Sequence, residues 1–452
     1  MTTGEFLSCY GKICFLGIGG VGTSALAVYL KTRGAEVFGF DRDEKQPRVQ
    51  KLQSSGIFVT NDEQKLPPAD AVVYSGALKD SDLLLRLGKN AAVFSRAEIL
   101  GMILAEFPTS VGISGCHGKT TATAMLGEIM RGTRSAVFLG GEYAPFAENS
   151  GFGNLYLGGE SVAIAEACEY QKSFLWLKPT VAVCLNVDAD HMDCYRGYED
   201  LVATYQRFLA GGTVAVVNAD DPVLCRYPDA VTFGFCKKAD YLAENESAIC
   251  GRYSFDLSER GKYVGRIALS VPGRHQIYNA LAAIAAARQL FVPFSVVREK
   301  IESFSGVSRR TQKLGEAFSG ELYADYAHHP REIAAEISAF REMKKRPVAF
   351  IFQPHTYTRT GYLFERFVRA LSVDAPVAVY RTYAARERGE DDLARSLAAH
   401  VSAPYLADEA ALFNAIETCL TEGRSVLLLG AGDIYNAGER YLKRVQSING
   451  NG

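Results

Sequence analysis

The chain has 452 residues, of which 48% are hydrophobic, and a formal net charge of −2 at pH 7. Its length predicts several domains at ~150 residues each, and no apolar run reaches the ~18 residues that a membrane-spanning helix needs. The near-neutral charge argues against a nucleic-acid partner or an anionic membrane surface. Met1 to Tyr10 lacks the basic and apolar regions of a signal peptide. Ten cysteines without a Cys-x-x-Cys pair suit a reducing compartment, so we expect a cytoplasmic protein without membrane insertion.

A glycine-rich turn follows the first predicted strand. Lys12 to Leu16 is an apolar strand, and after the turn a helix leads to a second strand, Glu36 to Phe40. This order, with an acidic residue ~20 positions after the glycines, matches the dinucleotide fingerprint. Taken alone, the fingerprint suggests NAD, with Asp41 on a ribose hydroxyl, although such a turn allows close approach of any pyrophosphate. The residues of this site are Gly17, Ile18, Gly19, Gly20, Val21, Gly22 and Asp41.

A second phosphate-binding loop spans Gly115 to Thr121. Before it, Val111 and Ile113 alternate with small residues as in a buried strand, and apolar residues at helical spacing follow it. Such a turn directs backbone N–H groups and the positive end of a helix at an anion. Lys119 adds a charge for the β- and γ-phosphates, and Thr120 adds an oxygen for a magnesium ion. The full pattern has a glycine at the position of Ile113, so this loop is a shortened variant that we predict to bind ATP.

Polar residues follow two further predicted strands. Val162 to Ala165 ends at Glu166, and Val181 to Leu185 is followed by a segment that contains His191. Ligands collect at the carboxyl ends of strands in an open α/β sheet. Glu166 and His191 are therefore predicted to converge near Lys119 and to hold a divalent ion. Carboxylate suits Mg²⁺, while imidazole leaves room for Mn²⁺. Alternative ligands in the same segment are Asp188, Asp190 and Asp193.

All histidines except His400 lie in polar segments that resemble motifs. Three of these segments are Pro272–Asn279, Asp325–Pro330 and Phe352–Arg359, which contain His275, His328, His329 and His355. A lone histidine is commonly a satisfied polar group near a core. Clustering beside Asp, Arg and Gly residues instead indicates binding sites. By contrast, we expect Trp176 to lie in a core and Lys344–Arg346 to form a solvated turn.

Taken together, these motifs resemble those of the Mur ligases, the ATP-dependent amide-forming enzymes that build the peptidoglycan stem peptide. The resemblance runs from the Gly17–Gly22 turn to Gly430–Ile434. It rests on the segments Gly-x-x-Gly-Lys-Thr-Thr, Asp-His-Met-Asp, Asp-Tyr-x-His-His-Pro and Gln-Pro-His-x-Tyr-x-Arg-Thr. The last two favour the members that join L-alanine to UDP-N-acetylmuramate through an acyl phosphate.

The resemblance implies a three-domain α/β fold. A Rossmann-like domain over residues 1–105 would hold the UDP group. The resemblance therefore implies that the Gly17–Gly22 turn binds UDP and not a redox cofactor. A central P-loop ATPase-like domain with a parallel sheet, over residues 106–307, would hold ATP and the metal. A C-terminal Rossmann-like domain over residues 308–452 would bind the amino acid and close over the substrates. We expect a monomer or a weak homodimer whose partners are small molecules.

The resemblance also implies roles for individual residues. The ATP site would comprise Gly115, Cys116, His117, Gly118, Lys119, Thr120, Thr121, His275, Asn279, Arg310 and Asp325. Ser75 would join the first turn in the UDP-sugar site, and Thr120, Glu166 and His191 would surround the metal. The amino-acid site would comprise Tyr326, His328, His355 and Arg359. Arg359 suits a carboxylate because its planar fork binds in a bidentate manner, and His328 is the expected base.

The sequence departs from the family pattern at particular positions. Cys116 stands where the loop usually has threonine, and Thr356 replaces an arginine that some relatives place near the substrates. Tyr383–Glu387 resembles a substrate-facing loop of the relatives and is therefore a candidate substrate-binding segment.

Other functions stay open on the sequence alone. They are a recycling ligase that attaches a whole tripeptide to the same sugar nucleotide, an NAD-dependent redox enzyme, and a non-catalytic sensor of UDP-sugar and ATP. The redox enzyme would leave the ATP loop idle.

Overall fold

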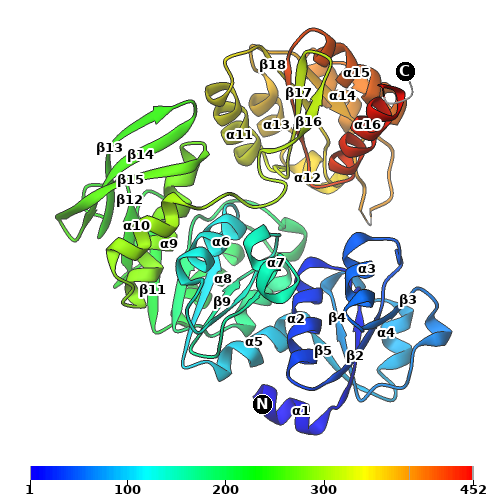
Figure 1. Cartoon of the computed structure of the whole chain (residues 1–452), viewed down its shortest axis with the longest axis vertical. Coiled ribbons are helices and arrows are strands. Elements are labelled where there is room, and N and C mark those ends of the chain that lie inside the picture. The colour runs from blue at the N-terminus through cyan, green and yellow to red at the C-terminus, as the bar shows by residue number, and fades with distance from the viewer. Residues whose placement is uncertain (1, 386, 450–452) are drawn as a thin grey trace. The chain divides into compact units, whose positions relative to one another are not determined.

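The computed structural model describes residues 2–385 and 387–449. Over these residues the strands form three sheets with helices on their faces (Figure 1). The chain divides into two compact units. Unit 1 comprises Met1–Leu242, Ser258–Val264 and Tyr278–Ile301, and unit 2 comprises Ala243–Leu257, Gly265–Ile277 and Glu302–Gly452. The predicted α/β class with parallel sheets is confirmed.

The first sheet, in unit 1, has the strand order β3-β2-β1-β4-β5, and all its pairs are parallel. Its strands are β1 (Lys12–Leu16), β2 (Glu36–Phe40), β3 (Phe58–Thr60), β4 (Ala71–Tyr74) and β5 (Ala92–Ser95). Its helices are α1 (Thr3–Cys9), α2 (Val21–Thr32), α3 (Pro47–Ser54), α4 (Asp82–Leu87) and α5 (Arg96–Glu106). The strand order reverses between β1 and β4, and ligands of open α/β sheets bind at such a reversal. The glycine-rich turn after β1 therefore lies at the expected binding edge.

The second sheet begins at β6 (Thr109–Ser114), which lies between β10 (Val181–Cys184) and β9 (Val162–Glu166). The sheet continues through β10 to β11 (Val214–Asn218) and β12 (Val231–Gly234), and through β9 to β7 (Ser135–Phe138) and β8 (Leu155–Leu157). Every residue of β10 is buried, as expected for a parallel strand covered on both faces. The helices are α6 (Lys119–Met130), α7 (Ala144–Ser150), α8 (Tyr198–Ala210) and α10 (Phe294–Glu302).

Residues of both units contribute to a further set of elements: β13 (Tyr241–Ile249), β14 (Arg252–Glu259), β15 (Lys262–Pro272) and α9 (His275–Gln289). The first residues of α9, up to Ile277, belong to unit 2, and the rest of the helix belongs to unit 1.

The third sheet, in unit 2, has the strand order β16-β17-β21-β18-β19-β20. Its strands are β16 (Gln312–Ala317), β17 (Gly320–Asp325), β18 (Val348–Phe352), β19 (Val377–Tyr380), β20 (Tyr405–Leu406) and β21 (Ser425–Leu429). Only the β16–β17 pair is antiparallel among the pairs described. The helices are α11 (Pro330–Met343), α12 (Tyr357–Tyr362), α13 (Phe364–Leu371), α14 (Asp392–His400), α15 (Glu409–Thr421) and α16 (Ile434–Asn449). β21 is central and wholly buried, so its Ser-Val-Leu-Leu-Leu sequence forms the core of this sheet.

The prediction that Trp176 lies in a core is wrong, because its side chain is 57% exposed. It ends a short, kinked 3-10 helix, η3 (Tyr170–Trp176), which directs Phe174 inward instead. Phe174 is fully buried, and its ring stacks on that of Phe208 at 4.8 Å. The predicted solvated turn at Lys344–Arg346 is also only partly correct. Lys344 is largely covered and pairs with Glu321 at 2.8 Å.

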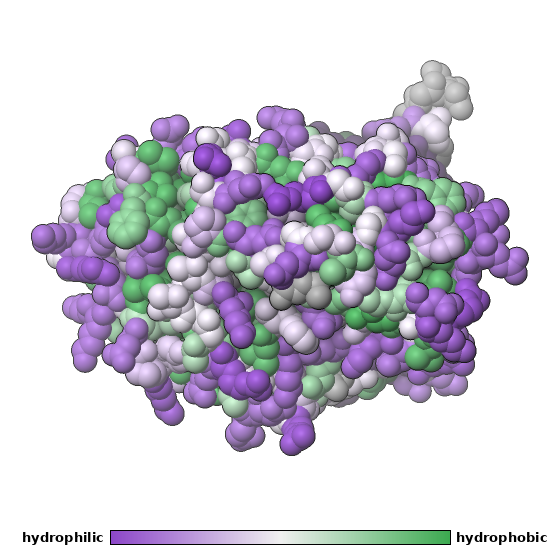
Figure 2. All heavy atoms as spheres, turned by 90° about the horizontal axis from the view of Figure 1, so that it is seen from below, coloured by the Kyte–Doolittle hydropathy of each residue, from purple (hydrophilic) through white to green (hydrophobic). Residues whose placement is uncertain are grey.

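Among the described residues, no helix is both long and apolar enough to cross a membrane. Figure 2 shows one face of the molecule, on which hydrophobic areas are separated by hydrophilic side chains.

Replacing Phe174 by alanine is expected to lower the free energy of unfolding by about 3–5 kcal/mol, because it removes a buried ring and leaves a cavity. Trp176→Ala on the same short helix is the control, and its effect should stay within about 0.5 kcal/mol because the ring is exposed. Thermal unfolding of both variants measures the difference. Equal losses in melting temperature would contradict this assignment of the core.

Candidate active site

The loop between β6 and α6 has the backbone of a phosphate-binding loop. Gly115 and Gly118 have φ angles of +138° and +83°, which favour glycine. Asn186, two residues after the end of β10, holds the loop, since its Oδ1 accepts from the His117 N–H at 2.9 Å and its Nδ2 donates to the His117 carbonyl at 3.0 Å. A Cβ on Gly118 would overlap the Oδ1 of Asn279. Asn279, predicted for the ATP site, therefore packs directly against the loop.

Cys116, at the position where we expected threonine from the family pattern, makes polar contacts of its own. The Asp188 N–H donates to the Cys116 sulfur at 3.0 Å, and that sulfur lies 3.5 Å from the Tyr205 hydroxyl. Burial is the main cause that raises the pKa of the Cys116 thiol well above its usual range. The thiol therefore stays protonated and serves to hold the loop.

Lys119, the first residue of α6, is held by a carboxylate that sequence reasoning missed. Its Nζ lies 2.9 Å from Oε2 of Glu169, whose side chain is fully buried. Nζ also donates to the carbonyl oxygens of Gly115 and Cys116. Burial is the largest influence and acts to lower the pKa of Lys119, but the Glu169 carboxylate and smaller contributions from neighbouring groups together raise it above its ordinary value. The ammonium group is therefore charged and fixed at the phosphate-binding turn.

Two sets of possible metal ligands surround this turn. The Thr120 hydroxyl donates to Oε2 of Glu166 at 2.9 Å, and the Gly140 N–H donates to the same oxygen. His191 lies near Glu169 and Asp190. One nitrogen of the His191 ring and one carboxylate oxygen of each acidic residue lie within 4.8 Å of one another. The donor types in both sets fit Mg²⁺ or Mn²⁺. Asp190 was a predicted alternative ligand, whereas the side chain of Asp193 lies outside the described structure.

The turn after β1 is closed by backbone hydrogen bonds and by Asp41. The N–H groups of Gly17 and Ile18 donate to the Phe40 carbonyl, and the Gly19 N–H donates to Oδ2 of Asp41 at 2.8 Å. Gly17 has a φ of +72°, and a Cβ there would lie 2.9 Å from the Ser75 hydroxyl. Gly17, Ser75 and Asp41 thus lie around one turn, as predicted. Asp41 shapes that turn, and its contact with a nucleotide stays a prediction.

A cavity of about 250 Å³ within unit 1 is lined both by Gly22 of the first turn and by Glu166, a predicted metal ligand. It is lined by Gly22 of α2, by Arg96 at the start of α5, and by Glu166 at the end of β9. Its other lining residues are Ala25, Leu26, Leu100, Phe138, Leu139, Gly140 and Cys168. The Arg96 guanidinium approaches Gly22 so closely that a Cβ there would lie 3.1 Å from it. Arg96 was assigned to no site from the sequence, so its place in this cavity was missed.

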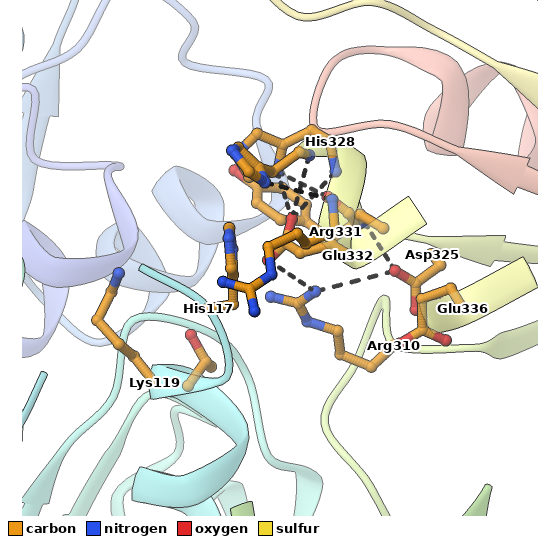
Figure 3. Close-up of polar contacts among 12 residues, drawn as sticks. His117, Lys119, Arg310, Asp325, His328, Arg331, Glu332 and Glu336 are labelled. Atoms are coloured by element: carbon orange, nitrogen blue, oxygen red, sulfur yellow. Dashed lines mark hydrogen bonds and ion pairs between the residues drawn. The ribbon is translucent and has the colours of Figure 1, made fainter. Parts of the chain in front are cut away.

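Arg310 and Asp325, two residues of unit 2 for which we predicted contacts with ATP from the motifs of this region, lie close to each other (Figure 3). Arg310 lies 3.9 Å from both Asp325 and Glu332. Asp325 ends β17, and its carboxylate accepts from the N–H groups of Thr311 and Ala327 at 2.6 and 2.7 Å. Burial and then the nearby Glu336 raise the pKa of Asp325 above its ordinary value.

His275 pairs with Glu336 rather than standing alone. Its Nε2 lies 3.2 Å from a carboxylate oxygen of Glu336, and that carboxylate also accepts from the Thr311 hydroxyl at 2.8 Å. Burial acts to lower the pKa of His275, but Glu336 raises it above its ordinary value. His275 and Asn279 share α9, yet His275 belongs to unit 2 and Asn279 to unit 1.

The residues predicted for the amino-acid site form one cluster in unit 2. The rings of Tyr326 and His328 lie 5.4 Å apart, and those of His328 and His355 lie 5.7 Å apart. Nδ1 of His355 lies 3.0 Å from the Arg359 guanidinium. Nδ1 of His328 faces the Tyr326 carbonyl at 3.0 Å and the Glu332 carboxylate at 3.4 Å. In the tautomer that these acceptors favour, the ring proton is on Nδ1 and Nε2 carries the lone pair.

Family models match nearly the whole chain. The Mur ligase family catalytic domain matches residues 12–108, the Mur ligase middle domain residues 113–287, and the Mur ligase glutamate ligase domain residues 309–432. A UDP-N-acetylmuramate–L-alanine ligase of Aquifex aeolicus is 35% identical over 449 residues, which cover 96% of this chain and 98% of the relative.

Solved structures agree with these matches. The crystal structure of a UDP-N-acetylmuramate–alanine ligase of Thermotoga maritima has a TM-score of 0.83 at 26% identity and covers 96% of this chain and 99% of its own. A murein peptide ligase of Psychrobacter arcticus has a TM-score of 0.74 at 20% identity over 96% of this chain and 98% of its own, which shows a shared fold. With its three-domain α/β fold, its phosphate-binding loop and these matches, the chain belongs to the Mur ligase family.

Proposed function

We propose that this chain joins L-alanine to the lactyl carboxylate of UDP-N-acetylmuramate, with ATP as the energy source. The products are UDP-N-acetylmuramoyl-L-alanine, ADP and phosphate, in the cytoplasmic part of peptidoglycan synthesis. The observation that carries this proposal is the cluster of Tyr326, His328, His355 and Arg359, in a chain that also holds the Lys119 loop. Near-full-length similarity to a ligase named for these substrates supports it.

The first step activates the carboxylate. Hydroxide is a poor leaving group, so a carboxylate and an amine do not condense in water. A carboxylate oxygen of the lactyl group attacks the γ-phosphorus of ATP, the bond to the β-phosphate oxygen breaks, and ADP leaves. The approach of two anions needs positive charge, which the Lys119 ammonium and the N-terminus of α6 supply. A divalent cation held by Thr120 and Glu166, or by Glu169, Asp190 and His191, would neutralise further phosphate charge.

The cavity in unit 1 gives the sugar nucleotide a path to this step. The diphosphate of UDP would lie against the N–H groups of the turn after β1 and the N-terminus of α2. The lactyl arm would enter the cavity past Gly22, where Arg96 offers a cation to its carboxylate. Glu166 lines the other part of the cavity, beside Thr120 of the ATP loop.

The second step forms the amide. The Arg359 guanidinium holds the carboxylate of L-alanine, since its planar fork can bind both oxygens. The amine attacks the acyl carbon, and the tetrahedral intermediate collapses with phosphate as the leaving group. Nε2 of His328 accepts the proton that the amine loses. Tyr326 and His355, whose rings both lie next to that of His328, complete this site.

The division into domains at residues 1–105, 106–307 and 308–452 remains part of the proposal. The sheets support it, because the first sheet ends with β5 and its helix α5 before β6 begins at Thr109. The third sheet likewise begins with β16 at Gln312. A monomer or weak homodimer is proposed without a contribution from a second copy to the site.

Lys119→Ala is expected to lower ATP-dependent product formation by about a hundredfold or more, because a charge aimed at the transferred phosphoryl group is lost. Lys237→Ala, an exposed lysine of the same unit, is the control and should leave the rate unchanged. Coupled assay of ADP release measures both variants. A near wild-type rate for Lys119→Ala would contradict the assignment of the loop.

The substrate panel tests the function itself. Phosphate release from ATP and magnesium is measured with UDP-N-acetylmuramate and, in turn, L-alanine, glycine, L-serine or the stem tripeptide. Release that requires both the sugar nucleotide and L-alanine is the expected result. Release with the tripeptide alone would move the assignment to a recycling ligase, and nucleotide binding without release would favour a sensor.

A further inference from the structure

The cluster that contains His355 and Arg359 is bound to a second segment of unit 2, residues 382–391. The Tyr383 N–H donates to the Pro354 carbonyl, and the Thr356 N–H donates to the Tyr383 carbonyl, each at 2.9 Å. These bonds form a short parallel bridge between His355 and Tyr383. The rings of the same two residues stack at 5.6 Å with an interplanar angle of 26°. The position of the His355 ring therefore depends on the 382–391 segment.

Glu387 of this segment ties down the helix that carries Arg359. One oxygen of its carboxylate, Oε2, accepts from the N–H of Tyr357 at 2.6 Å and from the N–H of Thr358 at 2.9 Å. These are the first two residues of α12, whose N–H groups have no partner within the helix. Hydrogen bonds to a charged acceptor are stronger than neutral ones. A single carboxylate thus fixes the start of α12 from outside the helix.

The backbone that leads into α12 needs this support. Thr356 has φ +66° and ψ 146°, a conformation that residues with a side chain rarely adopt. Its hydroxyl accepts from the Arg359 N–H at 3.4 Å, so the strained residue and Arg359 are directly linked. Strained backbone persists where the surrounding contacts over-determine it. The bonds from Tyr383 and Glu387 on either side of Thr356 provide those contacts.

The 382–391 segment is itself anchored at its far end. The Asp391 carboxylate accepts from the Thr382 N–H at 3.0 Å and from the Tyr405 hydroxyl at 2.6 Å. Gly389 approaches the Tyr357 ring, since a Cβ there would lie 3.0 Å from it. Arg386 lies outside the described residues. Glu387 is thus presented to α12 from an anchored segment.

We propose that Glu387 is a positioning residue of the amino-acid site. By holding the start of α12, it sets the direction of the Arg359 guanidinium and, with Tyr383, the position of His355. Loss of its carboxylate leaves two helix N–H groups unpaired and lets Arg359 move off the carboxylate of the bound amino acid. This inference rests on the proposed function, because Arg359 receives the amino-acid carboxylate there.

The test compares Glu387→Ala, Glu387→Gln and Glu390→Ala in the full-length enzyme. Glu387→Ala should raise KM for L-alanine at least about tenfold, as expected when hydrogen bonds to a charged group are lost. KM for ATP and for UDP-N-acetylmuramate should stay unchanged, which separates positioning from general damage. Glu387→Gln keeps an acceptor oxygen and should show a smaller rise. Glu390 is exposed in the same segment, so Glu390→Ala should match the wild type.

Hydrogen–deuterium exchange gives a readout that needs no activity. The peptide that covers Tyr357–Tyr362 should exchange faster in Glu387→Ala and at the wild-type rate in Glu390→Ala. A wild-type KM for L-alanine, or unchanged exchange in Glu387→Ala, would overturn the proposal. If Glu387→Ala does not fold, Glu387→Gln decides by the same two measurements. Wild-type enzyme without L-alanine-dependent turnover would instead refute the proposed function, and faster exchange would then show only that Glu387 holds α12.

Discussion

The ion pair of Lys119 and Glu169 is the constraint on which the rest of the site depends. A buried charge without a partner is costly, so neither side chain could occupy this place alone. With the pair present, a fixed ammonium stands at the turn between β6 and α6, where the helix already favours an anion. A polyphosphate brings its own negative charge and can compete with Glu169 for Lys119. The neighbouring polar residues, Asn186 and Asn279, hold the loop in the shape that this exchange requires.

The balance of charge in unit 2 follows the same principle with different residues. Arg310 lies between two carboxylates, and the Glu336 carboxylate raises the pKa of His275 despite its burial and so favours the charged form. Each cation is therefore held in place by protein groups and needs no large rearrangement before it meets an anionic substrate, as electrostatic preorganisation requires. The amino-acid cluster is built similarly, since His328 is oriented by a carbonyl oxygen and a carboxylate on the same nitrogen. These protein partners orient the side chains of the site, and an anionic substrate would add the negative charge that the cations attract.

The sequence predicted the strands that bear the site, but not the side chains that hold the site residues in place. The strands Lys12–Leu16 and Glu36–Phe40 have the predicted bounds, because their apolar runs and flanking glycines are local signals. No local pattern of this kind marks the side chains of Glu169, Arg48 and Arg96 as part of a site. Glu169 follows the end of β9, three positions after Glu166, and its pairing with Lys119 depends on how β9 lies beside β6. Arg48 lies in α3, and its guanidinium donates a hydrogen bond to the Gly19 carbonyl at 3.0 Å. The prediction that Trp176 is buried failed for a related reason. A kinked 3-10 helix has no regular periodicity from which buried and exposed positions can be told apart.

The most direct test of the account follows the oxygen atoms of the lactyl carboxylate. UDP-N-acetylmuramate with heavy oxygen in that carboxylate is incubated with ATP, magnesium and L-alanine, and the released phosphate is examined by mass spectrometry. Transfer of the γ-phosphoryl group to the carboxylate places a labelled oxygen between carbon and phosphorus, and attack of the amine releases that oxygen with the phosphate. An acyl-phosphate mechanism predicts one labelled oxygen in each phosphate formed, in amounts equal to the amide product. Phosphate without label, or label found in AMP, would contradict an acyl-phosphate ligase.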